Sequence, residues 1–182
     1  MPSPDILVLR LSSLGDIVLT APVYRNLKAH WPQARITVMV KPQSAAVLAG
    51  NQFVDKVLTF NGFFDAVRTI RRGAFSHLLD LHGTGRSYLL RKLSGAPQVA
   101  AYRKHALARR LYVLFRWSSP ALAKHTLDRY LEALGQWGVP VLHRELHLGD
   151  YGPGRSARTG AAAKRVLLMQ TSFLGDALLT VP

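Results

Sequence analysis

The sequence predicts an α/β fold in which helices cover both faces of a parallel sheet. Short runs of apolar and β-branched residues alternate with helical patterns between residues 5 and 102, which is typical of βαβ units. The runs at 6–9 and 36–40 are almost continuously apolar, as expected for strands that are buried on both sides. Right-handed crossovers would then place helices on the two faces of one sheet.

The elements follow in order along the chain. Strands are predicted at 5–11, 35–40, 54–60, 76–81 and 99–102, and helices at 17–30, 43–50, 63–72 and 85–93. Pro22 is either tolerated in the first turns of the helix at 17–30 or marks the start of its regular part. Two further helices are predicted at 103–117 and 125–137, and the alternation at 141–148 favours an edge strand.

An internal repeat suggests how the chain is divided. The stretch LSSLGDIVLTAP at 11–22 returns as TSFLGDALLTVP at 171–182, and seven of the eleven positions from Ser12 to Pro22 are identical. Residues 150–164 are rich in Gly, Ser, Ala and Arg, which is typical of a linker. We therefore expect one domain at 1–149, a linker at 150–164, and the truncated start of a second, similar domain at 165–182.

Composition limits the possible functions. The 182 residues include no cysteine, which excludes disulfides, thiolate metal sites and cysteine nucleophiles. No signal peptide or membrane-spanning run is present, so a cytoplasmic protein is expected. The net charge is +14, and residues 68–129 hold thirteen Lys and Arg against two acids. This segment is either a solvated basic surface or a binding surface for anions such as nucleic acid, anionic lipid or phosphorylated substrates.

The turn after the first strand carries the main candidate residue, Asp16. Ligands of open parallel sheets bind beyond the carboxyl ends of the strands, where this turn is expected. Asp16 is either a helix cap or, at that edge, a general base or a carboxylate that positions the ligand, and sequence alone leaves these roles open. Gly15 would allow a tight turn or a close ligand approach.

Two other constellations have simpler explanations. The HGTGRS stretch at 82–87 could cradle a phosphate near Arg86, but it is neither a GxGxxG nor a P-loop motif and fits a tight strand-to-helix turn. His143, Glu145 and His147 would share one side of the strand at 141–148, an alternation that an exposed edge strand explains without a metal.

The motifs resemble those of glycosyltransferase family nine, the bacterial ADP-heptose:lipopolysaccharide heptosyltransferases. The resemblance rests on ILVLRLSSLGDIVLTAPVYRNLKAHWP, RITVMVKP and VDKVLTF, with support from HLLDLHGTGRSYLLRKLSGAPQVAAYRK and HTLDRYLEALGQWGVP. It covers roughly residues 5–148, and the SSLGD opening is its most specific part.

The resemblance implies a Rossmann-like acceptor-binding domain, the N-terminal half of a GT-B enzyme at the cytoplasmic face of the inner membrane. It implies transfer of heptose from ADP-heptose, a co-substrate, to a phosphorylated lipid A–core acceptor, with no cofactor and no metal. Asp16 would be the catalytic base. The residues expected to bind substrate are Ser12, Ser13, Gly15, Arg86, Arg103 and Lys104.

One feature departs from the family pattern. A donor-binding domain should follow the linker, yet the chain begins a second acceptor-like domain at 165–182. We therefore expect this chain to be a fragment that is inactive alone and needs a donor domain. The alternative, based on the basic segment, is a nucleic-acid-binding α/β module without catalysis, although no nucleic-acid-binding signature is present and no nucleic acid partner is expected.

Overall fold

A five-stranded, wholly parallel sheet lies at the centre of the computed structural model, which describes residues 3–102 and 125–146. The strands are β1 (Asp5–Leu9), β2 (Arg35–Val40), β3 (Lys56–Thr59), β4 (His77–Asp80) and β5 (Gln98–Ala101). Their spatial order is β3-β2-β1-β4-β5, so the chain crosses from one edge to the other side of β1 after β3. The switch point of this sheet, where such folds bind ligands, therefore lies between the carboxyl ends of β1 and β4.

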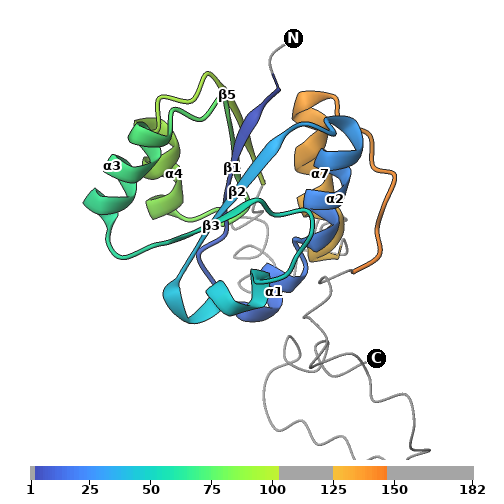
Figure 1. Cartoon of the computed structure of the whole chain (residues 1–182), viewed down its shortest axis with the longest axis horizontal. Coiled ribbons are helices and arrows are strands. Elements are labelled where there is room, and N and C mark those ends of the chain that lie inside the picture. The colour runs from blue at the N-terminus through green and yellow to red at the C-terminus, as the bar shows by residue number, and fades with distance from the viewer. Residues whose placement is uncertain (1–2, 103–124, 147–182) are drawn as a thin grey trace, which may run out of the picture.

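Helices cover both faces of the sheet, as predicted. Helices α3 (Phe63–Gly73) and α4 (Gly85–Leu93) lie on one face, and α2 (Ala21–His30) and α7 (Thr126–Leu134) lie on the other (Figure 1). Each face has its own apolar core because side chains alternate along the strands. In β1, Ile6 and Val8 join the core with α2 and α7, whereas Leu7 and Leu9 join the core with α3 and α4.

The helix predicted at 17–30 is two helices. The short helix α1 (Leu14–Val18) begins three residues before the predicted start at 17, in the SSLGD turn, and α2 begins at Ala21. Pro22 is the second residue of α2 and has no N–H for the carbonyl of Val18, so one continuous helix cannot form here. The possibility that Pro22 marks the start of the regular helix is confirmed.

Two other elements differ from their predicted form. The helix expected at 43–50 is a 3₁₀ helix, η1 (Pro42–Leu48), and the helix expected at 125–137 ends as a 3₁₀ turn, η2 (Gly135–Trp137). The prediction of a strand at 141–148 is wrong for residues 141–146, the part that the structure describes, because this segment is irregular. The buried side chain of Asn26 takes the place of a neighbouring strand, because its Oδ1 accepts from the N–H groups of Leu142 and His143 at 2.7 and 3.0 Å.

Several predictions lie outside the described residues. They are the helix at 103–117, the linker at 150–164 and the second-copy start at 165–182, so the proposed domain boundaries stay predictions. Within residues 3–102 and 125–146, no helix combines the length and apolarity that crossing a bilayer requires.

The end of α3 provides a test of packing. A Cβ atom at Gly73 would lie 2.3 Å from the ring of Phe75, which is buried in the core beneath α3 and α4. We expect Gly73→Ala to destabilise the fold by about 1–3 kcal/mol, the usual cost of overpacking. Gly135→Ala is the matched control, because its φ of −60° is ordinary and a Cβ there meets no atom within 4 Å. Urea unfolding of both variants checks this, and equal midpoints would contradict it.

Candidate functional site

The site is built around Arg10, the first residue after β1. Its side chain is buried at the carboxyl edge of the sheet, and its Nη1 donates to the carbonyl of Leu81 at 2.6 Å. Leu81 directly follows β4, so the guanidinium bridges the two strand ends at the switch point. A buried cation is stable only when it is paired, and the pairing partner here is Asp16.

The Asp16 carboxylate is held by donors from three parts of the chain. Its Oδ2 forms an ion pair with Arg10 and accepts from the backbone N–H and the Oγ of Ser13, at 3.3 and 3.0 Å. Its Oδ1 accepts only from the Tyr130 hydroxyl among the described residues, at 3.3 Å. Oδ1 is therefore the oxygen with capacity left for a hydroxyl of a bound ligand.

Tyr130 comes from α7, far from Asp16 in sequence. The Arg10 guanidinium carbon lies 5.4 Å from the Tyr130 ring centroid, and the Tyr102 ring meets the same ring edge-on at 5.2 Å. Burial raises the pKa of Tyr130 well above its ordinary value, more than the nearby Arg10 charge lowers it. Tyr130 therefore stays neutral near pH 7 and can donate to the carboxylate.

Electrostatics keep Asp16 ionised. Burial raises the pKa of Asp16, but the Arg10 charge and the hydrogen bonds from Ser13 and Arg10 outweigh burial and lower it below 3.8. The side chain keeps 32% of its surface exposed, so the carboxylate remains within reach of a ligand. An ionised, positioned carboxylate of this kind can accept a proton from a hydroxyl group.

The structure gives Ser13 and Asp16 separate roles at the start of α1. Ser13 is the N-cap, and Asp16 is the third residue of the first turn, whose side chain reaches back to the Ser13 N–H. Asp16 is thus not the N-cap itself, although it supports the helix start. Its bond with Arg10 goes beyond what a cap requires.

The other predicted site residues are only partly brought together. Ser12 and Gly15 lie in the same turn as Asp16, half-buried and buried respectively. Arg86 is exposed in the first turn of α4, where its guanidinium carbon lies 5.8 Å from the Phe60 ring centroid, and no described contact joins it to Asp16. Arg103 and Lys104 lie outside the described residues.

The turn at 82–87 is satisfied internally. The buried Asp80 carboxylate accepts from the N–H groups of His82 and Gly83 at 3.0 and 3.1 Å. Thr84 and Ser87 form a reciprocal capping box that uses both of their own N–H groups. Because these donors are occupied and a carboxylate sits among them, the geometry favours a tight turn over a phosphate cradle.

The sequence predicted that His143, Glu145 and His147 share one side of a strand. The structure shows no strand at the two described members of this set, His143 and Glu145. Both residues lie in the irregular segment at 141–146, and Glu145 is 3.4 Å from Arg25, while His147 lies outside the described residues. Within the described ranges, no three His, Asp or Glu side chains converge as metal ligands would.

Sequence reasoning missed two members of the cluster. Arg10 offered a signal, since a charged residue directly after a buried strand and before a turn needs a buried partner. Tyr130 offered none, because it is one of several regularly spaced residues of its helix and meets Asp16 only through the tertiary fold.

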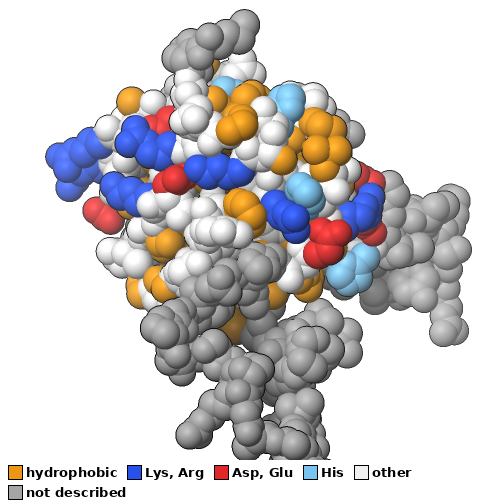
Figure 2. All heavy atoms as spheres, turned by 45° about the vertical axis from the view of Figure 1, so that its right-hand side comes forward, with side chains coloured by type: hydrophobic (Ala, Val, Ile, Leu, Met, Phe, Trp, Pro, Cys, Tyr) orange, Lys and Arg blue, Asp and Glu red, His pale blue; other side chains and the backbone are white. Residues whose placement is uncertain are grey.

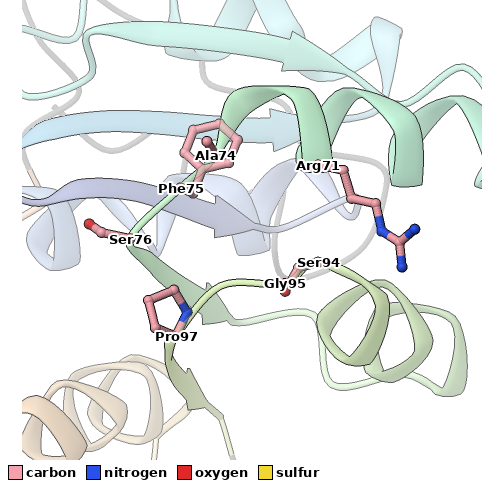
Figure 3. Close-up of a pocket in the computed structure, with 7 residues that line it drawn as sticks. All are labelled: Arg71, Ala74, Phe75, Ser76, Ser94, Gly95 and Pro97. Atoms are coloured by element: carbon pink, nitrogen blue, oxygen red, sulfur yellow. The ribbon is translucent and has the colours of Figure 1, made fainter.

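A hollow of about 700 Å³ lies elsewhere, at the opposite edge of the sheet. Figure 3 shows it between the end of α3 and the segments leading into β4 and β5, with Ser76 and Pro97 directly before those strands. Arg71 lines it, but its Nε already donates to the carbonyl of Leu93 at 2.8 Å. This hollow holds no carboxylate and is separate from the Asp16 cluster.

Comparison with solved structures identifies the fold. The chain is similar to a glycosyltransferase family 9 protein from Veillonella parvula, with a TM-score of 0.63 and 21% identity, over 80% of this chain and 45% of that one. It is also similar to ADP-heptose LPS heptosyltransferase II of E. coli, with a TM-score of 0.59 and 21% identity, over 79% and 46% of the two chains. For E. coli heptosyltransferase WaaC with ADP, the TM-score is 0.61 at 16% identity, over 79% and 50%.

These likenesses confirm the predicted fold class, a Rossmann-like parallel sheet of the kind found in these glycosyltransferases. The chain spans about half the length of the structures it matches. No protein-family model matches the sequence, and no curated protein matches it.

The stabilisation of the fold by the ionised Asp16 side chain should depend on pH. Its pKa is lowered in the folded state, so its stabilisation is complete above the ordinary value of 3.8 and is lost as pH falls through the lowered pKa. We expect Asp16→Asn to lower the Tm at pH 7 and the difference from the parent to shrink toward pH 3. The exposed Asp65→Asn is the control, and a constant difference for Asp16→Asn across this range would contradict the ion pair.

Removal of Arg10 should cost more than removal of an exposed partner. Arg10→Met leaves Asp16 partly buried without its cation, and we expect a loss of about 2–3 kcal/mol, below the values for fully buried pairs because Asp16 is partly exposed. Arg144→Met breaks an exposed pair with Asp128 and should cost less than about 1 kcal/mol. Denaturant unfolding measures both, and equal losses would show that the Arg10 pair is no more important than a surface pair.

Proposed function

We propose that this chain is the acceptor-binding part of a glycosyltransferase of lipopolysaccharide core synthesis, which transfers heptose from ADP-heptose to a phosphorylated lipid A–core acceptor. The observation that carries the proposal is the ionised Asp16 carboxylate at the switch point of the sheet. Support comes from the fold, which is shared with solved structures described as heptosyltransferases.

In this proposal Asp16 acts as the general base. A hydroxyl of the acceptor donates to Oδ1, the oxygen that carries only the Tyr130 contact among described residues. As the acceptor oxygen bonds to the anomeric carbon, its proton passes to Asp16. The bond from that carbon to the nucleotide diphosphate breaks, and ADP leaves with the electron pair. Attack from the side opposite the leaving group inverts the configuration at the anomeric carbon.

The neighbouring residues would orient the reacting groups. Arg10 and Ser13 fix Oδ2, so the carboxylate presents Oδ1 in one direction. Ser12, Ser13 and Gly15 would line the acceptor at the turn, and the cations Arg86, Arg103 and Lys104 would meet its phosphates. The proposal assigns no cofactor and no metal, since the nucleotide sugar is a co-substrate.

The location follows from the acceptor. A lipid-linked acceptor places the enzyme at the cytoplasmic face of the inner membrane, whose anionic lipids attract basic segments such as the one at 103–117. The nucleotide sugar would bind to a donor domain, which fits the observation that this chain spans about half of its structural neighbours.

The role of Asp16 can be tested by turnover. In a fusion of this chain with the remaining part of a structural neighbour, we expect Asp16→Asn to lower turnover by about 10²–10⁴-fold, the usual contribution of a positioned general base. Binding of a delipidated, phosphorylated core oligosaccharide by calorimetry should change little, because the amide keeps the size of the carboxylate. Asp65→Asn is the control. Full turnover in Asp16→Asn would remove Asp16 from the reaction, and absence of oligosaccharide binding in the parent would remove the proposed acceptor.

A further inference from the structure

Cations are partnered differently on the two sides of the sheet. Beside α2 and α7, ion pairs join Lys28 to Asp55 at 2.8 Å, Arg25 to Glu145 at 3.4 Å and Arg144 to Asp128 at 2.5 Å. Figure 2 looks toward this side, where Lys and Arg side chains lie next to carboxylates. The cations of this side are therefore largely neutralised by the chain itself.

Helices α3 and α4 show the opposite pattern. None of their cations pairs with a carboxylate of the described residues, and their single exposed acid is Asp65. The six cations are Arg68, Arg71, Arg72, Arg86, Arg91 and Lys92. Such a concentration of unneutralised charge attracts a large anionic partner.

Apolar side chains are exposed among these cations. On α4, Leu89 and Leu93 are one turn apart and are 51% and 38% exposed, beside Tyr88 at 47%. On α3, Phe64 is 83% exposed and lies one turn before Arg68. Exposed apolar groups gathered in a basic surface are typical of helices that lie in a lipid interface.

We propose that the outward surface of α3 and α4 is where this chain contacts an anionic lipid bilayer. The partner is a membrane and not a nucleic acid, because a duplex offers phosphates to the cations but no apolar region to Leu89 and Leu93. The inference rests on the proposed function in one respect, namely that a lipid-linked acceptor brings the enzyme to a bilayer.

The position of the surface suits such an acceptor. Helices α3 and α4 follow β3 and β4, so both begin at the carboxyl edge, the edge that holds Asp16. Phe64 and Arg86 lie in their first turns, and the two helices lie side by side (Figure 1). A bilayer against this surface would hold a lipid-anchored acceptor next to the edge where its head group reacts.

Binding of the full chain to phosphatidylcholine vesicles, with and without phosphatidylglycerol at about 30 mol%, tests the proposal. We expect binding to the anionic vesicles alone, and weaker binding at high salt. The variant Arg68→Gln/Arg72→Gln/Lys92→Gln should bind the anionic vesicles roughly 10–100-fold more weakly than the parent, because each cation contributes up to about fivefold in affinity. Leu89→Asn in the parent chain should also weaken binding to the anionic vesicles. Its effect should be largest at high salt, where charge contributes least to binding.

The control removes the same charge from the other side, as Arg25→Gln/Lys28→Gln/Arg144→Gln, and should bind nearly as well as the parent. Circular dichroism confirms that both triple variants fold. Equal weakening by the two variants would reduce the effect to net charge and overturn the proposal, as would unchanged binding of the α3 and α4 variant.

Duplex DNA that displaces the vesicles at equal phosphate concentration would make this a nucleic-acid surface. Oligosaccharide binding is measured without lipid, so failure here is distinct from failure of the proposed function.

Discussion

The buried guanidinium of Arg10 is the interaction on which the carboxyl edge depends. It contacts the carbonyl after β4, the carboxylate of α1 and the ring of Tyr130 in α7. A cation removed from water needs each of these partners, and each comes from a different part of the chain. The requirement to satisfy one charge therefore fixes the relative positions of two strand ends, the SSLGD turn and a helix more than a hundred residues away.

The opposite edge is organised by aromatic packing. The His77 ring lies 5.4 Å from Trp31 and 5.0 Å from Trp137, centroid to centroid, which joins β4 to the ends of α2 and η2. Burial lowers the pKa of His77 and favours its neutral form. The two edges thus differ in chemistry, since edge-on and tilted ring contacts join the elements at one edge and a charge cluster joins them at the other.

The strands and their parallel pairing could be predicted because burial on both faces leaves a continuous apolar pattern, as in Ile6–Leu9. The break between α1 and α2 was within reach, since Pro22 lacks the donor that a single helix needs. The irregular segment at 141–146 was not, because its geometry depends on the Asn26 amide, a tertiary partner that alternation of residues does not reveal. Asp16 could be singled out by position, but its partners Arg10 and Tyr130 required the fold.

The geometry also bears on the choice between the roles that the sequence left open for Asp16, a helix cap or a carboxylate that acts on a ligand. A first-turn carboxylate needs only the N–H groups of the helix start, and the Ser13 N–H already meets that need. A buried arginine directed at the same oxygen adds stabilisation of the ionised form that no helix start requires. At the same time, the second oxygen is left with one neutral donor from Tyr130. One oxygen is thus bound tightly by charge while the other keeps capacity for a ligand, an arrangement that suits a carboxylate held for chemistry better than one held only to begin a helix.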